Sequence, residues 1–111
     1  MPPSLAQLHA FALGVHQTAV EKGWWEEGRH ASFGEFIALT HGELSEALEA
    51  SRAGDPPDDK LPAFRNLEVE LADCILRILD YSQAHDLRVI EAMVAKAAFN
   101  KTRPYRHGKK F

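Results

Sequence analysis

The sequence predicts an all-α fold, a four-helix bundle built as a single domain over residues 1–111. Three observations support this prediction. Apolar residues recur at three- and four-residue steps in four segments, no segment shows the strict alternation of a half-buried β-strand, and most links between the segments are short. A chain of 111 residues can bury one hydrophobic core but is too short for two.

Caps and glycines delimit the first two helices. Ser4 and Ser32 each stand three residues before a Gln or Glu, which is the spacing of a capping box. The helices are expected to end near Gly23 and at Gly54, because glycine is common just past a helix C-terminus. The residues expected to face the core are Leu5, Leu8, Ala12, Val15 and Ala19 in the first helix, and Phe33, Ile37, Leu44 and Leu48 in the second.

Prolines and charges separate the second helix from the third. Residues 55–62 (DPPDDKLP) combine three prolines with dense charge and are predicted to form a loop. The third helix is predicted over residues 66–84. The fourth is expected to begin after Asp86, as its N-cap, and to end near Lys101, because Pro104 prevents much continuation.

The composition is that of an ordinary globular protein. A hydrophobic content of 45% and a charged content of 26% argue against disorder. The single cysteine, Cys74, excludes an internal disulfide and a cysteine-based zinc site. The sequence has neither a signal-peptide pattern nor an apolar run near the roughly 20 residues that cross a membrane, so we expect a cytoplasmic protein without membrane contacts.

Charge is distributed unevenly along the chain. Residues 101–111 hold five of the thirteen Lys and Arg residues and no acid, which leaves the other hundred residues with a net charge of −8. A basic segment on an acidic body suits a nucleic-acid arm, a clamp for an anionic ligand or simple solubility. Charge alone does not choose among these three.

Four carboxylates on two helices form the main candidate site. Glu43 and Glu46 are three residues apart on the second helix, as are Glu70 and Asp73 on the third, so each pair projects to one side. The third helix is apolar over most of its circumference and should lie centrally or at an oligomer interface, where carboxylates are costly unless paired or bound to a cation. Such oxygen donors suit Mg²⁺ or Mn²⁺. Alternatively, the first pair is solvated and Asp73 pairs with Arg77 at i+4.

Two further groups of residues are candidates for ligand binding. Trp24 and Trp25 could stack on a nucleobase, although tryptophans at a helix end more often close a small core, with one of two neighbours inside and the other exposed. The residues that could grip a polyphosphate, instead of forming a solvated terminus, are Lys96, Asn100, Lys101, Arg103, Tyr105 and Arg106.

Together, these residues resemble the MazG-like nucleoside triphosphate pyrophosphohydrolases, the all-α NTP pyrophosphatases. The matching stretches, in the family's order, are GWW at 23–25, ALTHGELSEALEA at 38–50, VELADCILRILDY at 69–81 and KAAFNKTRPYRHGKK at 96–110. The family's metal motif, Glu-x-x-Glu followed by Glu-x-x-Asp, falls on the four carboxylates. Many members carry one more acid where this chain has Gly42, which leaves the number of metal ions open; Glu49 could compensate.

The resemblance implies a bundle completed by dimerisation, as a dimer or a dimer of dimers. It implies a Mg²⁺ enzyme, with Mn²⁺ as a substitute, that cleaves a (deoxy)nucleoside triphosphate between the α and β phosphates. Glu43 and Glu46 would be catalytic, with Glu46 as the expected proton acceptor. The C-terminal residues would hold phosphates and a tryptophan would hold the base. Two alternatives remain: hydrolysis of another phosphorylated nucleotide, such as phosphoribosyl-ATP, and a non-enzymatic helical module whose basic segment binds nucleic acid, which the acidic body disfavours.

Overall fold

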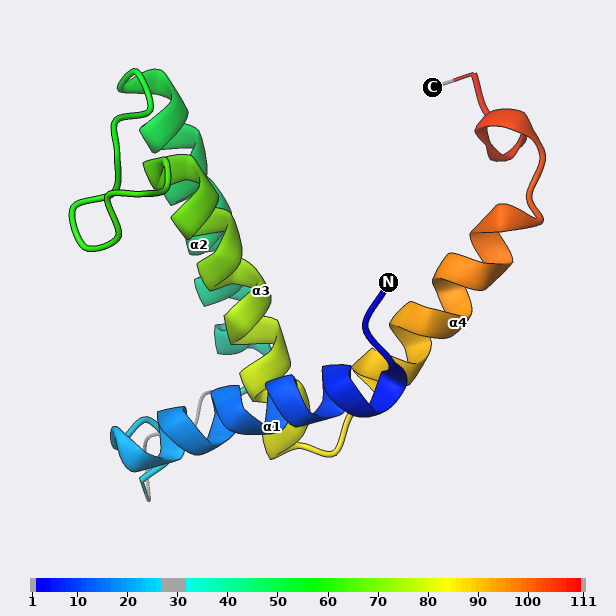
Figure 1. Ribbon diagram of the computed structural model, residues 1–111, viewed down its shortest axis with the longest axis horizontal. Coiled ribbons are helices and arrows are strands. Elements are labelled where there is room, and N and C mark those ends of the chain that lie inside the picture. Colours follow the sequence, from blue (N-terminus) through cyan, green and yellow to red (C-terminus); the bar gives the residue numbers. More distant parts are fainter. Residues whose placement is uncertain (1, 27–31, 111) are drawn as a thin grey trace.

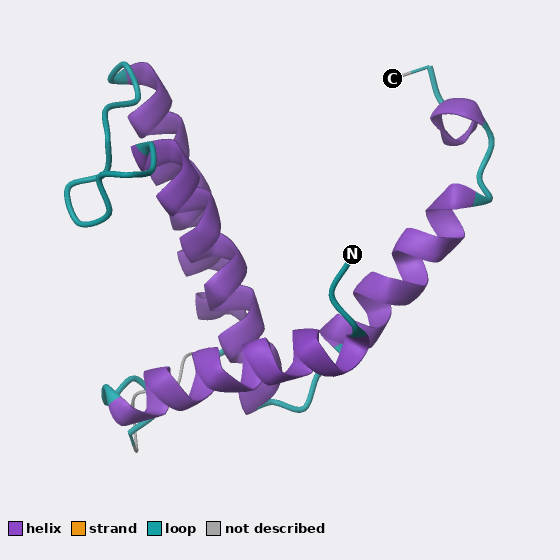
Figure 2. Ribbon diagram, in the orientation of Figure 1, coloured by secondary structure: helices purple, strands orange, loops and turns teal. Residues whose placement is uncertain are grey.

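The protein is all-helical over the residues that its computed structural model describes, 2–26 and 32–110 (Figures 1 and 2). These residues form four α-helices and one 3₁₀ helix, and they contain no β-strand. The sequence-based prediction of an all-α fold with four helices is therefore confirmed. The elements are α1 (Leu5–Glu21), α2 (Phe33–Arg52), α3 (Asn66–Ala84), α4 (Val89–Lys101) and η1 (Tyr105–Gly108).

The expected caps delimit α1 and α2. The Ser4 hydroxyl accepts the Gln7 backbone N–H and the Gln7 side chain accepts the Ser4 N–H, which completes a capping box. The Ser32 hydroxyl accepts the backbone N–H of Glu35 at 3.2 Å. Gly23 and Gly54 follow the two helices with φ of +86° and +89°, in the left-handed region where a side chain would be strained.

The predicted N-cap of α4 is wrong. Arg88, not Asp86, precedes the first residue of α4. Asp86 instead has a φ of 53° and follows the end of α3, where the Leu87 N–H donates to the Ser82 carbonyl at 2.9 Å. This is the hydrogen bond of a Schellman motif, and aspartate is one of the few residues that tolerate its left-handed position. Asp86 therefore terminates α3.

The four helices pack pairwise. Helices α2 and α3 lie side by side and antiparallel, α1 crosses the end of this pair and packs on α3, and α4 packs on α1 and runs away from the pair (Figure 1). The third helix was expected to lie centrally or at an oligomer interface; α3 contacts both α1 and α2, while its Leu71 and Ile75 remain exposed. No helix among the described residues combines the length and the apolar composition that a membrane crossing requires.

One small apolar junction holds three helices together. Ala12 of α1, Leu79 of α3 and Ile90 of α4 are 0%, 6% and 2% exposed, and Leu8 packs against them. Ala12 and Leu8 belong to the predicted stripe of the first helix. This junction fixes where α4 leaves the α2–α3 pair.

The predicted core stripe of the second helix is wrong for the single chain. Its four residues, Phe33, Ile37, Leu44 and Leu48, are between 38% and 60% exposed, whereas Phe36, Ala47 and Ala50 are buried against α3. At about 100° per residue, the buried face lies roughly a quarter turn from the predicted stripe. The two alanines let the helices approach closely, and the larger residues remain beside the contact.

Two aspartates order the link between α2 and α3, which extends the predicted 55–62 loop to Arg65. Asp55 accepts the backbone N–H of Leu67 at 2.9 Å and pairs with Arg65. The backbone hydrogen bond, followed by the Arg65 side chain and its charge, lowers the pKa of Asp55 despite some desolvation. Asp58 is buried and accepts two backbone N–H groups of its own turn.

Truncation of Ile90 tests the junction. The Ile90→Ala variant is expected to lower the free energy of unfolding by about 2–5 kcal/mol, because it leaves a cavity where three helices meet. Ile75→Ala is the matched control: Ile75 is 56% exposed on α3, so the same change should cost less than about 1 kcal/mol. Urea unfolding followed by circular dichroism measures both, and equal losses would show that the junction has no special weight.

Candidate functional site

Three of the four predicted metal-binding carboxylates come together. Glu43 and Glu46 of α2 and Glu70 of α3 each offer a carboxylate oxygen, and these oxygens lie within 4.8 Å of one another. The three-residue spacing on α2 turns the first two toward α3, and the antiparallel packing of the helices places Glu70 opposite them. We refer to these three residues as the carboxylate cluster.

The cluster carries unfavourable electrostatics. The pKa of Glu70 is raised from 4.5 to about 7, chiefly by desolvation and next by a hydrogen bond with Glu46. The negative charges of Glu46, Asp73 and Glu43 raise it further. Like charges held this close disfavour ionisation of the last carboxyl group, and a bound cation would relieve the repulsion.

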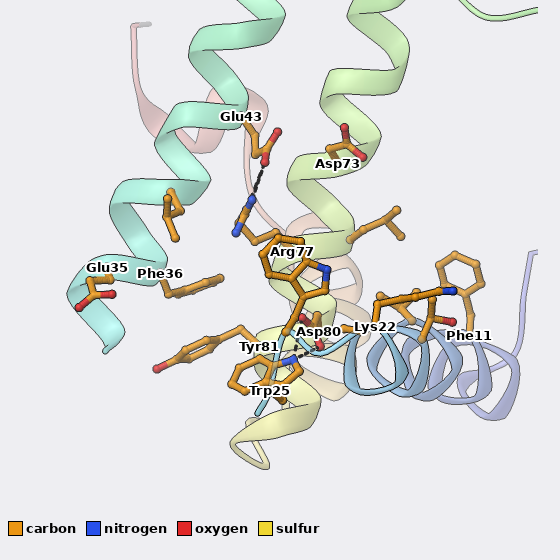
Figure 3. Close-up of a pocket in the computed structure, with 16 residues that line it drawn as sticks. Phe11, Lys22, Trp25, Glu35, Phe36, Glu43, Asp73, Arg77, Asp80 and Tyr81 are labelled. Carbon is orange, nitrogen blue, oxygen red and sulfur yellow. Dashed lines mark hydrogen bonds and ion pairs between the residues drawn. The ribbon is translucent and has the colours of Figure 1, made fainter. Parts of the chain in front are cut away.

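Asp73, the fourth predicted ligand, lies beside the cluster and outside the set of mutually close oxygens. Desolvation raises its pKa, as do the charges of Glu43, Asp58 and Glu46, while the charge of Arg77 opposes the shift. Figure 3 shows Asp73 on α3 facing the space between the two helices, as Glu43 does from α2. The structure thus brings the carboxylates of both motifs to one place, with Asp73 at the edge.

Arg77 of α3 forms an ion pair with Glu43 of α2 and not with a residue of its own helix. Its Nη2 donates to Glu43 Oε1 at 2.7 Å and its Nε to the same oxygen at 3.3 Å. The Asp73–Arg77 pair that the alternative interpretation predicted is not formed. One oxygen of Glu43 is therefore held by a cation from α3, next to the carboxylate cluster.

A cavity of about 700 Å³ opens directly beside these groups, among residues of α1, α2, α3 and the segment after α1. Glu43 and Asp73 line it near the cluster, whereas Trp25, Phe36 and Tyr81 line it further along (Figure 3). Arg77 lies between the carboxylates and the rings. The volume of the cavity falls within the roughly 300–1,000 Å³ that small-molecule sites occupy.

The two tryptophans differ in exposure, as expected for neighbours, and both line the cavity. Trp24 is 66% exposed, whereas Trp25 is half-buried. The Trp25 indole N–H donates to both carboxylate oxygens of Asp80, at 2.9 and 3.0 Å, and Asp80 also bonds His16 Nδ1 at 2.7 Å. Trp25 is thereby fixed to α3.

The predicted phosphate-binding residues lie on a separate part of the chain. Lys96 and Arg103 face the Phe99 ring at 5.1 and 5.7 Å from its centre, and a second, shallower hollow gathers Asn100 and Arg103 with later residues. Because α4 packs on α1 and runs away from α2 and α3, the described chain does not bring this group to the carboxylates (Figure 1). We call the predicted residues the C-terminal basic cluster: Lys96, Asn100, Lys101, Arg103, Tyr105 and Arg106.

Neither of the two residues of α2 that left the metal count open, Gly42 and Glu49, belongs to the carboxylate cluster. Glu49 pairs with Arg52 at 3.2 Å and stays largely exposed. A Cβ added at Gly42 would meet no atom within 4 Å, so no described residue fills the space that this glycine leaves.

Two polar side chains of the cavity were not assigned a role from the sequence. Arg77 and Asp80 stand four and seven residues after Asp73, along one edge of α3, so helical periodicity places all three together. The hydrogen bond from His16 to Asp80 joins residues 64 positions apart and has no sequence signal.

No protein-family model, no curated protein and no solved structure matches this chain.

Removing the Glu70 charge tests the electrostatics of the cluster. The folded protein raises the pKa of Glu70 to about 7 and therefore favours the protonated side chain. This preference stabilises the folded state at pH values below the unfolded pKa, near 4.5, and the stabilisation is lost as the pH rises through about 7. In EDTA, the parent should therefore be less stable above about pH 7 than near pH 5. Glu70→Gln should flatten this dependence and raise the melting temperature at the higher pH.

Calorimetry between these two pH values measures the effect. Glu21→Gln, the same change on an exposed residue of α1, should keep the slope of the parent. If the melting temperature of Glu70→Gln depends on pH as steeply as that of the parent, the raised pKa does not belong to Glu70.

Proposed function

We propose that this protein is a Mg²⁺-dependent nucleoside triphosphate pyrophosphohydrolase, which converts a (d)NTP to the monophosphate and pyrophosphate. One observation carries the proposal: Glu43, a member of the carboxylate cluster, and Asp73 beside it line a cavity together with Trp25, Phe36 and Tyr81. A ligand that fits such a cavity has a planar ring at one end and a metal-binding anionic chain at the other. A nucleoside triphosphate has both.

The donor set fits Mg²⁺. It consists of oxygen atoms alone, which magnesium prefers, and it has more negative charge than the single nearby Arg77 can neutralise. Around octahedral Mg²⁺, opposite ligands stand about 4.2 Å apart and adjacent ligands about 2.9 Å apart, so the three oxygens, which lie within 4.8 Å of one another, would move closer together on binding the ion. Bound there, Mg²⁺ would neutralise phosphate oxygens and lower the pKa of a water molecule. Mn²⁺, with the same preference for oxygen, is expected to substitute.

Glu43, Glu46 and Glu70 would hold the cation from both helices, with Asp73 at the edge of the site. Glu46 is exposed at the rim of the cluster and accepts the proton of the attacking water, since it can exchange that proton with solvent. Arg77 is placed to contact a phosphate oxygen, because it already lies between the carboxylates and the aromatic rings.

The C-terminal basic cluster contributes from a second copy of the chain. Within one chain it lies apart from the carboxylates, yet its guanidinium and ammonium groups have the chemistry that a leaving pyrophosphate needs. The exposed stripe of α2, Phe33, Ile37, Leu44 and Leu48, offers apolar surface for such an association. A dimer, or a dimer of dimers, would bury this stripe and complete the bundle.

One observation favours a second function. Part of the C-terminal basic cluster lines its own hollow and could bind nucleic acid without the carboxylates: Asn100, Arg103 and Arg106 lie there with His107, Lys109 and Lys110. In that case, RNA or DNA binding would weaken steeply with salt and would be unaffected by Mg²⁺. The acidic body makes this the less favoured of the two functions.

Turnover tests the main proposal. With Mg²⁺ and each common NTP and dNTP, the protein should release pyrophosphate and the monophosphate. Asp73→Asn and Glu43→Gln should lower kcat/KM about a hundredfold or more, because each removes a carboxylate that would hold the cation, whose charge would stabilise the transition state. Glu49→Gln should keep the parent's rate, since the Glu49 carboxylate pairs with Arg52. Absence of turnover with every nucleotide, or full activity in Asp73→Asn, would refute the proposal.

Mixing two inactive variants tests the contribution of the second copy. One variant carries Glu43→Gln and the other Arg103→Ala with Lys101→Ala. In a two-fold dimer with shared sites, an equal mixture should regain about a quarter of the parent's activity, because half the dimers are mixed and each holds one intact site. If carboxylates and cations act within one chain, every site keeps a defect and the mixture stays inactive.

A further inference from the structure

The wall of the cavity contains a polar arrangement that the hydrolytic chemistry does not use. Asp80 accepts hydrogen bonds from two rings, Trp25 and His16, which come from different parts of the chain. Its carboxylate is 20% exposed and points from α3 toward the segment that follows α1 (Figure 3). An ionised carboxylate only accepts hydrogen bonds, so His16 presents Nδ1–H to it.

The Trp25 indole N–H donates to both oxygens of Asp80, and these two contacts restrict rotation of the Trp25 ring. Trp24, its neighbour, is 66% exposed, and no hydrogen bond of its indole is formed within the described chain. A ring that is already held loses less conformational freedom on ligand binding than one that is free to rotate. Of the two tryptophans, Trp25 is the one prepared to receive a ligand.

Trp25 also lacks a stacked partner among the described residues. His16 and His85 lie near its ring at interplanar angles of 66° and 69°, and Tyr81 lies at 49°. Tyr81, by contrast, is stacked on Phe36 at 4.0 Å and 11°. The indole is therefore surrounded by inclined rings, with one side lining the cavity and none of these neighbours parallel to it.

We propose that Asp80 is a positioning residue, which holds the Trp25 indole at the cavity wall so that it stacks on the base of the nucleotide. The proposal rests on the proposed function for the identity of the ligand and extends it to base recognition. Both Asp80 oxygens contact the Trp25 indole N–H, so the role assigned to Asp80 is to act on the base through Trp25. Stacking accepts every base, so Asp80 contributes affinity and little base selectivity.

Binding of deoxynucleosides to the metal-free protein tests this inference. Uncharged nucleosides avoid the repulsion between phosphates and the carboxylate cluster, and no turnover is required. In a Trp24→Phe background Trp25 is the only tryptophan, so its fluorescence reports binding directly. The four common deoxynucleosides are expected to quench this fluorescence.

Asp80→Ala should weaken binding about tenfold, by a similar factor for all four nucleosides, and should change the emission maximum of Trp25. Asp80→Asn keeps one oxygen acceptor for the indole N–H and should restore most of the affinity. This rescue separates positioning from general stability, because both variants lose the negative charge. If Asp80→Ala does not fold, Trp25→Phe provides the second test: it keeps a ring without the N–H and should weaken binding, measured by calorimetry.

Three results would overturn the proposal: unchanged affinity in folded Asp80→Ala, equal losses in Asp80→Asn and Asp80→Ala, or loss of binding in Trp24→Phe alone. Nucleoside binding without NTP hydrolysis would sink the proposed function and leave this inference intact. NTP hydrolysis with an unchanged KM in Asp80→Ala would support the proposed function and contradict the role assigned to Asp80.

Discussion

The close packing of α2 against α3 is the constraint on which the candidate site depends. Carboxylates of like charge repel one another, and the raised pKa of Glu70 shows that the fold holds them together against that repulsion. The burial of Phe36, Ala47 and Ala50 against α3 opposes it locally, as does the ion pair between Arg77 and Glu43. A cation bound at the cluster, as proposed, would relieve the remaining repulsion and would thereby stabilise the fold.

The cavity depends on the same pair of helices but needs α1 as well. Helix α1 packs on α3 and supplies one wall, and the segment after it places two tryptophans at the rim. Asp80 ties that segment back to α3 through Trp25. Asp73, Asp80 and Tyr81 all lie on α3, which therefore connects the carboxylate end of the cavity with its aromatic end.

Local signals predicted most of the helices, and packing explains where they were insufficient. Ser4, Ser32 and Gly54 act within one helical turn, so their effect is readable from the sequence. Asp86 was assigned to the wrong helix because aspartate suits both an N-cap and a left-handed helix end, and the sequence does not say which. The core stripe of α2 was predicted on the wrong face because an apolar pattern identifies a face suited to burial without identifying the element that covers it.

The i,i+3 carboxylates were predictable because helical periodicity places them on one side. The Arg77–Glu43 and His16–Asp80 bonds were not predictable, because they depend on tertiary packing.

The small residues at the α2–α3 contact have a consequence for ion selectivity. Where two alanines face the partner helix, the distance between the helix axes is set by methyl groups, and so is the span between carboxylates that project from opposite helices. Magnesium requires oxygens at about 2.0–2.1 Å, whereas calcium accepts about 2.3–2.6 Å and more ligands. If the carboxylates bind a cation as proposed, a bulkier residue at Ala47 would separate the axes and favour the larger ion. The volume of side chains outside the carboxylate cluster would then contribute to the choice of cation.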